Sequence, residues 1–523
     1  MVNEAETRWG RVRGSRTGGA VVFRAIPYGA PTWGDGRFRP PRPPEAWAGV
    51  FDARADGPAA PQCDVERDVR AQAVADLMHP GYGDPLEGQV MSEDCLRVHV
   101  WTPGVDDAQR PVMVWLHGGG YQEGAALQTY SQADRLAAAQ DVVVVSVSHR
   151  LGLLGYTAFQ DVVGEDYRGS GQAGLLDLVQ ALEWVHDNIS AFGGDPGNVT
   201  VFGQSGGGMK VAVLLAMPSA AGFFHRAVIQ SGPARKVATR EQGARQGWDL
   251  LRAFDLKPAG APRRLAELPL RLLVEYQQRA IAAGNVRPDG AFVLQPSADD
   301  ATILSDRLTA AATGRQAKPV LVGTTFDESS TFLAAQDRAE DRRYGPDLSL
   351  DDVRQHLGTV TGERAAEVTA CYQDLYPAFE PYRILARALS DASFRAPSVR
   401  LAEDAARAGS PVYMYLFAYE PGALGGVLGA CHSADLPFTF GTTARVPLAG
   451  TRPDRWLMEE VMGAAWASFA RDGAPAVTAA GPWPPYQAGT RATMVLDVVP
   501  CLESNPGGAG LAAFDGMPAR LFE

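Results

Sequence analysis

The stretch VTVFGQSGGGMKVAVLLAM, residues 199–217, decides the fold of this chain. It begins as a short apolar strand and ends, after the glycines, as a helix of small and apolar residues. Between the two, G-x-S-x-G places Ser205 on a sharp turn, where bulky side chains two residues away on either side would have no space. The tight turn FGGDPGN at 192–198 leads directly into the strand, which argues against a merely flexible glycine loop. The stretch therefore predicts a nucleophilic serine between a strand and a helix.

Other short apolar runs predict the remaining central strands. They are continuous and rich in β-branched residues, as in parallel strands covered on both faces. These runs lie at 112–116, 142–148, 227–230, 319–323 and 411–417. Between the second run and Ser205, residues 175–192 have the period of a helix with one apolar side. The alternation predicts an α/β fold with a large, central, mostly parallel twisted sheet flanked by helices.

Two long stretches rich in Ala, Arg, Glu and Leu interrupt this alternation, at approximately 240–315 and 334–409. We expect them to be helical insertions that form a lid or side wall on a single domain spanning residues 1–523. The Pro/Gly clusters are typical of turns rather than of linkers between domains.

The composition restricts the class of function. With 46% hydrophobic and 21% charged residues, the chain is that of an ordinary globular protein. Its formal net charge of -12 and the lack of basic blocks argue against a nucleic-acid partner. No apolar stretch has the length of a signal peptide or a membrane span, so we expect no membrane insertion and a cytoplasmic location. The spacing of the five cysteines fits no zinc site, and we expect no metal.

A glycine run follows the strand at 112–116. In His117-Gly118-Gly119-Gly120 the bare backbone would let a carbonyl oxygen approach N–H groups closely. Acyl transfer needs such donors, because its tetrahedral intermediate carries a negative charge on oxygen. We expect the oxyanion donors to be the N–H groups of Gly119, Gly120 and Gly206.

A nucleophilic serine needs a histidine base and a carboxylate, in the chain order nucleophile, acid, base. Only His225, His356 and His432 follow Ser205. His225 is too close to leave room for an intervening acid, and His356 lies in a polar, apparently helical segment. His432 lies in a glycine-rich loop after the strand at 411–417, where a scaffold can present a catalytic side chain.

Two carboxylates compete for the role of the acid. Asp327 and Glu328 both follow the strand at 319–323, and their position does not decide between them.

The segment from Phe192 to Gly207 resembles the active-site signature of type-B carboxylesterases, the family that includes cholinesterases and bacterial p-nitrobenzyl esterases. Glu93-Asp94-Cys95-Leu96, running to Trp101-Thr102-Pro103, is similar to the second signature of that family, and the resemblance spans nearly the whole chain. It implies an α/β-hydrolase fold and serine-dependent ester hydrolysis. Gln204 and Gly206 depart from the Glu and Ala that are usual beside the serine.

The resemblance also implies roles for residues around the serine. It makes Glu328 the acid, with Asp327 in reserve, and His432 the base, although Ser433 and Asp435 replace the usual Gly and Glu. Ser231 resembles a serine that hydrogen-bonds the acid, and an ordinary turn serine is an equal alternative.

Two pairs of residues further from the serine are also implied by the resemblance. Arg150 and Asp177 resemble a buried ion pair of the family. Cys63 and Cys95 resemble its first disulfide, and free thiols are the alternative in a reducing compartment.

The expected function is a serine carboxylic-ester hydrolase for small to medium neutral esters, with water as the second substrate. Ser205 would attack the ester while touching His432, itself oriented by Glu328, and no metal or organic cofactor would be needed. The alternatives are a catalytically silent, cholinesterase-like binding protein, an amide or carbamate hydrolase, and a lipase. A monomer or a homodimer is expected.

Overall fold

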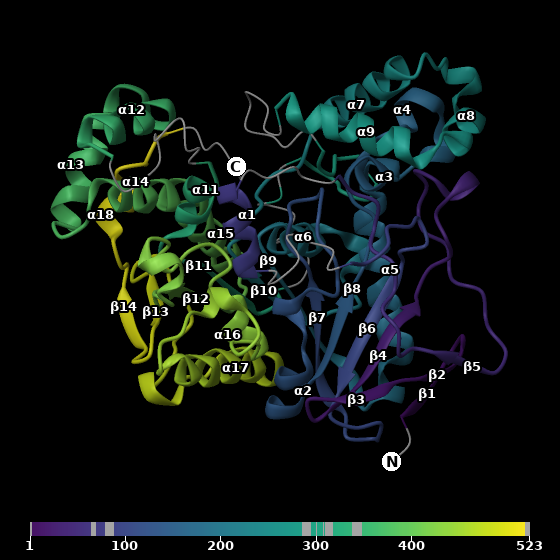
Figure 1. The fold of residues 1–523 in the computed structure, drawn as a ribbon, viewed down its shortest axis with the longest axis horizontal. Coiled ribbons are helices and arrows are strands. Elements are labelled where there is room, and N and C mark those ends of the chain that lie inside the picture. Colours follow the sequence, from purple (N-terminus) through teal and green to yellow (C-terminus); the bar gives the residue numbers. More distant parts are fainter. Residues whose placement is uncertain are drawn as a thin grey trace.

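The centre of the protein is a large mixed sheet (Figure 1). The structure is a computed structural model that describes residues 3–63, 69–78, 88–284, 294–299, 301–306, 308, 317–336 and 348–517. Within these ranges the sheet has eleven strands in the order β14-β13-β12-β11-β10-β9-β7-β8-β6-β4-β3. Neighbouring strands from β13 to β8 are parallel, and the strands at both edges pair antiparallel. This confirms the predicted α/β class with a mostly parallel sheet.

The strands of the main sheet have the following bounds: β3 Ser15–Thr17, β4 Ala20–Pro27, β6 Arg97–Thr102, β7 Arg110–Leu116, β8 Val143–Val147, β9 Gly194–Gln204, β10 Arg226–Gln230, β11 Val320–Thr325, β12 Val412–Phe417, β13 Ala492–Leu496 and β14 Cys501–Ser504. The strands from β7 to β12 correspond to the apolar runs of the sequence. A separate three-stranded sheet near the N-terminus contains β1 (Glu4–Thr7), β2 (Gly10–Arg13) and β5 (Val50–Asp52).

Hydrophobic cores cover both faces of the main sheet. Along β7, Val112, Val114 and Leu116 enter one core, and Met113 and Trp115 enter the other. Alternate side chains of a strand point to opposite faces, so a strand covered on both sides must be apolar throughout. This explains why the central strands could be identified from continuous apolar runs.

Different helices supply the two cores. The first core includes side chains of α5 (Ala173–Asn188), α6 (Gly206–Ala216) and α15 (Ala396–Arg407). The second includes side chains of α2 (Asp134–Gln140), α16 (Leu436–Phe440) and α17 (Arg455–Asp472). Trp184 is buried in the first core, and Trp466 and Phe469 are buried in the second.

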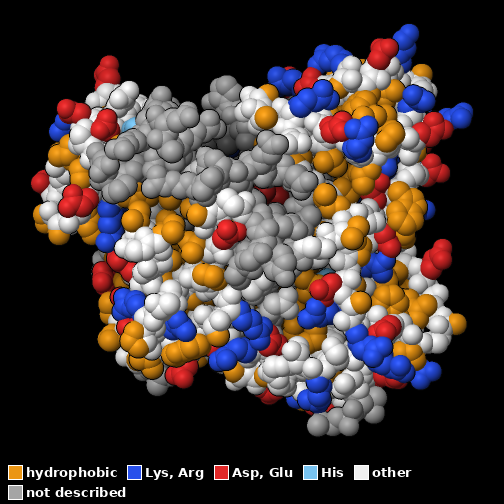
Figure 2. Space-filling model, in the orientation of Figure 1, with side chains coloured by type: hydrophobic (Ala, Val, Ile, Leu, Met, Phe, Trp, Pro, Cys, Tyr) orange, Lys and Arg blue, Asp and Glu red, His pale blue; other side chains and the backbone are white. Residues whose placement is uncertain are grey.

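Helices occupy the described parts of both predicted insertions. The first holds α7 (Arg240–Ala253), α8 (Ala261–Glu267) and α9 (Leu270–Ala282), and the second holds α12 (Leu350–Thr361), α13 (Ala365–Leu375), α14 (Pro381–Ser390) and α15. Figure 1 shows α7–α9 at the upper right and α12–α14 at the upper left. Acidic and basic side chains are interspersed over the upper right helices (Figure 2), which include ion pairs one helical turn apart such as Arg271–Glu275. The parts of the insertions at 285–293, 309–316 and 337–347 lie outside the described residues, and the lid remains a prediction.

Among the described residues, no helix combines the length and the apolar character needed to cross a bilayer.

Candidate active site

Ser205 lies on a strained turn at the carboxyl end of β9. Its φ of +55° and ψ of -125° are unusual for a residue with a side chain. The turn is held from both directions, because the Ser205 N–H donates to Gln230 O at 2.8 Å and Ser205 O accepts from Met209 N at 3.0 Å. Helix α6 begins at the next residue. The structure therefore has the strand, turn and helix that the sequence predicts around the serine.

Glycines make this turn possible because other backbone segments lie directly against them. A methyl group on Gly207 would lie 1.9 Å from Leu116 O, and one on Gly203 would lie 2.5 Å from the carbonyl carbon of Gly207. On the other side, a methyl group on Gly232 would lie 2.1 Å from Ser205 O. These distances are far below van der Waals contact, so the close approach of β7, β9 and the segment after β10 requires glycine.

The glycine run after β7 lies against the start of α6. A methyl group on Gly206 would lie 2.3 Å from Gly120 N, and one on Gly118 would lie 3.5 Å from Ser205 Cβ. Gly119 and Gly120 have φ of +85° and +63°, which glycine adopts freely. No described residue accepts a hydrogen bond from the N–H of Gly119, Gly120 or Gly206. The three expected oxyanion donors are therefore unpaired within the described part of the chain, and Gly120 and Gly206 lie side by side.

Glu328 and His432 form a buried pair. Glu328 opens α11 (Glu328–Gln336), directly beyond β11, and its Oε2 contacts His432 Nδ1 in a short hydrogen bond. Glu328 Oε1 accepts from the N–H of Thr325 at 2.8 Å, so both carboxylate oxygens have partners. The carboxylate is fully buried and accepts a hydrogen bond from Nδ1. This bond fixes Nδ1 as the protonated nitrogen and leaves Nε2 as the proton acceptor.

His432 Nε2 is in hydrogen-bond contact with the side chain of Gln204. Its distance to Gln204 Nε2 is 3.1 Å. The expected hydrogen bond between Ser205 Oγ and His432 is absent, although both residues are described. With Nε2 unprotonated, the Gln204 amide donates to it. The imidazole therefore lies at the residue before the serine, and the amide occupies its acceptor site.

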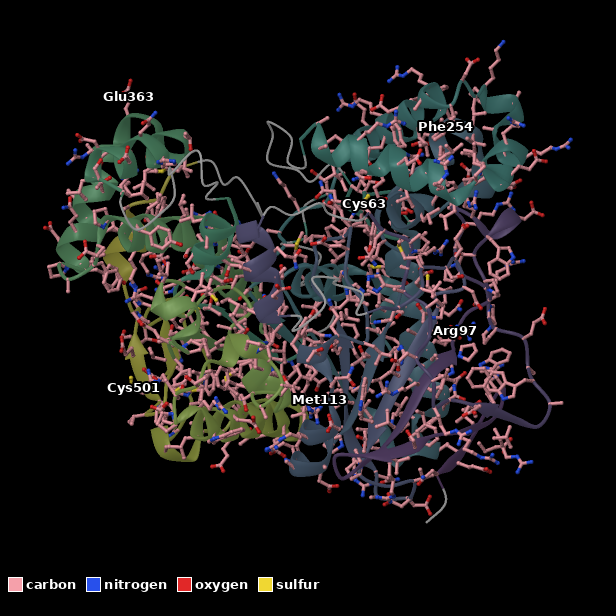
Figure 3. All side chains as sticks on the ribbon, in the orientation of Figure 1. Cys63, Arg97, Met113, Phe254, Glu363 and Cys501 are labelled. Atoms are coloured by element: carbon pink, nitrogen blue, oxygen red, sulfur yellow. The ribbon has the colours of Figure 1, made fainter. Side chains whose placement is uncertain are left out.

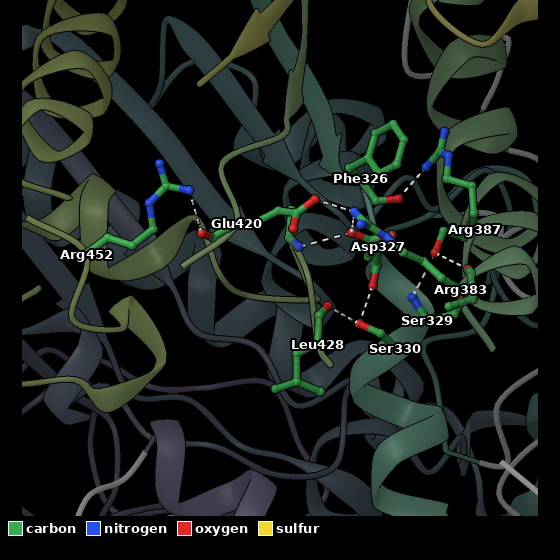
Figure 4. Close-up of polar contacts among 12 residues, drawn as sticks. Phe326, Asp327, Ser329, Ser330, Arg383, Arg387, Glu420, Leu428 and Arg452 are labelled. Carbon is green, nitrogen blue, oxygen red and sulfur yellow. Dashed lines mark hydrogen bonds and ion pairs between the residues drawn. The ribbon is translucent and has the colours of Figure 1, made fainter. Parts of the chain in front are cut away.

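Asp327 has a different environment from Glu328 (Figure 4). Its Oδ2 lies 3.1 Å from Arg383 Nη2 and accepts from Ala430 N at 3.1 Å, and its own N–H donates to Ala430 O at 2.8 Å. Burial raises the pKa of Asp327, and Arg383 acts against this shift. Ser330, one turn further, donates to Leu428 O at 2.6 Å. Asp327 and Ser330 therefore connect the loop of the acid to the loop of the base, and the contact with His432 belongs to Glu328.

Aromatic rings flank the imidazole. Phe332 on α11 and Phe394 on the π-helical segment Asp391–Arg395 each lie 5.1 Å from His432, centroid to centroid. Phe332 is 42% exposed, which is unusual for a phenylalanine. These rings give the surroundings of the base an apolar character. The adjacent Cys431 is buried, and burial raises the pKa of its thiol to about 12, so it stays protonated at neutral pH.

The other two histidines considered in the sequence do not approach Ser205. His225 Nδ1 accepts from Val199 N at 3.1 Å at the start of β10, and His356 Nδ1 lies 2.7 Å from Asp352 O on α12.

The possible role of Ser231 is not supported. Its hydroxyl is buried and has no hydrogen-bond partner among the described residues, so it does not bind the acid. Both carboxylate oxygens of Glu328 already have partners, the Thr325 N–H and His432 Nδ1. Ser231 instead contributes a positive φ of +51° to the turn after β10.

The disulfide implied for Cys63 and Cys95 is absent, because no S–S bond joins the two cysteines in the structure. Cys95 is buried, and Cys63 Sγ lies 3.7 Å from Val274 O. The predicted ion pair is present: Arg150 Nη2 and Asp177 Oδ1 are 2.6 Å apart and buried.

Sequence reasoning missed Lys210, which is fully buried on α6. A lysine inside the apolar run MKVAVLLAM was the available signal, because a buried lysine needs a specific reason. No group of three or more metal-ligating side chains occurs among the described residues.

Comparisons with known proteins agree over almost the whole chain. The sequence model described as the carboxylesterase family matches residues 2–508. The para-nitrobenzyl esterase of Bacillus subtilis is 35% identical over 96% of each chain, and the phenmedipham hydrolase of Pseudarthrobacter oxydans is 31% identical over 94% of each. A solved PNB esterase superposes with a TM-score of 0.80 at 32% identity, covering 98% of this chain and 99% of that one. A carboxylesterase of Geobacillus stearothermophilus gives 0.79 at 31% identity, covering 98% and 100%.

Proposed function

The chain belongs to the carboxylesterase family and has the α/β-hydrolase fold, and from this premise we propose that Ser205, His432 and Glu328 are the catalytic triad by which it hydrolyses carboxylic esters. The observation that carries the proposal is the buried Glu328–His432 pair, in which the second ring nitrogen of His432 contacts Gln204, the residue before Ser205. The three residues follow β9, β11 and β12 at the carboxyl ends of parallel strands, where ligands bind in open α/β sheets.

The proposed reaction has two steps. The Ser205 hydroxyl displaces the Gln204 amide from His432 Nε2, gives its proton to that nitrogen and attacks the ester carbonyl. The N–H groups of Gly119, Gly120 and Gly206 bind the resulting oxyanion. His432 then protonates the leaving alcohol, and a water molecule releases the acid by the same route.

Small to medium neutral esters with an apolar or aromatic group fit this site best. Phe332 and Phe394 line the base with aromatic faces, and the net charge of -12 disfavours the approach of anionic substrates. The para-nitrobenzyl esterase is the relative whose name points in the same direction.

Replacement of the nucleophile tests the triad. Ser205→Ala is expected to lower kcat for p-nitrophenyl acetate by a factor on the order of 10⁴ to 10⁶, measured beside Ser504→Ala on the edge strand β14, which should match the parent protein. An organophosphate should label the parent protein once per chain and leave Ser205→Ala unlabelled. Labelling that survives in Ser205→Ala would refute the assignment. A series of p-nitrophenyl esters from acetate to palmitate would then show the preferred acyl length.

A further inference from the structure

Lys210 lies beneath the oxyanion loop. It is the fifth residue after Ser205, on the first turns of α6, and its side chain is fully buried. Its Nζ donates to His117 O at 3.1 Å. His117 is the residue that joins β7 to the glycine run. The side chain therefore connects the helix that follows the nucleophile to the segment that carries two of the oxyanion donors.

Within the described residues, Lys210 has no carboxylate partner. No ion pair of Lys210 occurs among these residues, and its Nζ donates to one carbonyl oxygen, that of His117. The titratable groups that face it are His117, from the loop after β7, and His149, from the loop after β8, whose rings are 4.7 Å apart. Burial lowers the pKa of both histidines well below the usual value, so both are neutral at neutral pH.

A fully buried lysine without a counter-charge among the described residues is unusual. Burial lowers the pKa of Lys210 to about 7, because desolvation disfavours its charged form. The chain has four lysines, Lys210, Lys236, Lys257 and Lys318, among 48 basic residues. A protein that uses arginine almost throughout has a lysine at this position, and lysine is the basic residue that can lose its proton near neutral pH.

The oxyanion loop is fixed to α6 at two levels. At the upper level the backbone of Gly120 touches Gly206, and at the lower level Lys210 holds the His117 carbonyl. A developing negative charge at the N–H groups of Gly119, Gly120 and Gly206 would thus arise above a buried positive charge, in a region that screens charges weakly.

We propose that Lys210 is a positioning residue of the oxyanion hole, which holds the glycine run through the His117 carbonyl and favours the anionic tetrahedral intermediate by its buried positive charge. The proposal rests on the proposed ester hydrolysis by Ser205. Since the protonated lysine is the active form, kcat falls as pH rises through the titration of Lys210, in addition to the fall at low pH caused by protonation of the base.

Two replacements separate the hydrogen bond from the charge. Lys210→Met removes both, and Lys210→Gln keeps an N–H donor without the charge. Lys318→Met is the matched control, because Lys318 also donates to backbone carbonyls, Ala221 O and Phe224 O, in the segment between α6 and β10. The measurements are kcat and KM for p-nitrophenyl acetate from pH 6 to 10, and the affinity for a trifluoromethyl ketone, which forms an anionic tetrahedral adduct with a serine.

The expected result is a specific loss of transition-state binding. Lys210→Met lowers kcat by roughly 10- to 100-fold, which approaches the effect of losing an oxyanion donor. KM stays nearly unchanged, and the affinity for the trifluoromethyl ketone falls by a similar factor. Lys210→Gln recovers part of kcat. Neither variant shows the alkaline fall of the parent protein, and Lys318→Met keeps it.

A parent protein whose kcat stays flat from pH 7 to 10 would overturn the proposal, and this measurement needs no variant. Equal kcat and equal ketone affinity in folded Lys210→Met would overturn it as well. Both outcomes leave activity dependent on Ser205, whereas failure of the proposed function itself would appear as activity that survives Ser205→Ala.

Discussion

Gln204 is one of the residues at which the sequence departs from the family. It is also the hydrogen-bond partner of His432 Nε2. A neutral amide at His432 Nε2 supports the unprotonated imidazole that the reaction requires, since it can donate to the lone pair. A carboxylate in the same place would favour the protonated imidazole instead. The identity of one side chain beside the serine therefore bears on the pH range of the reaction.

Gln204→Glu tests this effect. We expect the acid limb of kcat/KM to move to higher pH by roughly one unit, because a carboxylate beside the imidazole stabilises its charged form and the base must be neutral. The measurement is the pH profile for p-nitrophenyl acetate from pH 5 to 9, with the exposed Gln487→Glu as the control. An unchanged acid limb would show that residue 204 does not face the base in solution.

At the scale of elements, the site depends on contacts between segments that are distant in the chain. Asp327 and Ser330, at the start of α11, hold the loop of His432 through Ala430 and Leu428 (Figure 4). Arg383 of α14 neutralises Asp327. The second insertion is therefore part of the support of the acid and the base, in addition to its expected role as a side wall.

The ion pair between Arg150 and Asp177 connects α5 to the loop after β8. Asp177 accepts from the Arg150 backbone N–H at 3.0 Å and from its guanidinium at 2.8 and 2.6 Å, and both residues are buried. Asp177→Asn should lower the free energy of unfolding by about 3 to 5 kcal/mol, because it leaves a buried guanidinium without its counter-charge.

Urea unfolding measures this loss, with Glu267→Gln as the control, since Glu267 pairs with Arg263 on the surface of α8. The control should change stability much less. Equal effects of the two variants would contradict the structural role of the buried pair.

At the scale of the whole molecule, the central strands and the chain order of the site residues could be predicted from the sequence. The edge strands of the sheet could not. Strands such as β7 are apolar on both faces, whereas all four residues of β14 are exposed, so no apolar run marks it. Likewise, G-x-S-x-G marks Ser205 through local sterics. The contacts of His432 with Gln204, and of Lys210 with His117, depend on how side chains meet across the fold, and no local pattern encodes them.

The five cysteines give a test of the molecule as a whole, because none of them forms a disulfide in the structure. Figure 3 shows Cys63 in the upper part of the view, below the upper right helices, and Cys501 at the lower left on the edge strand β14, where it is exposed. Titration with a thiol reagent in denaturant, without reductant, should give five thiols per chain, and reductant should leave the thermal midpoint unchanged. A count of three would instead support the pairing of Cys63 with Cys95.

The close approach of Gly203, Gly207 and Gly232 to neighbouring backbone has a consequence for attempts to alter the enzyme. In a library in which every position is randomised, even alanine should disappear from these three codons among active clones, while the exposed surfaces of α7 and α12 should accept many residues. Variants with new substrate preferences should therefore carry substitutions in the walls of the site, and the three glycines should stay unchanged in them.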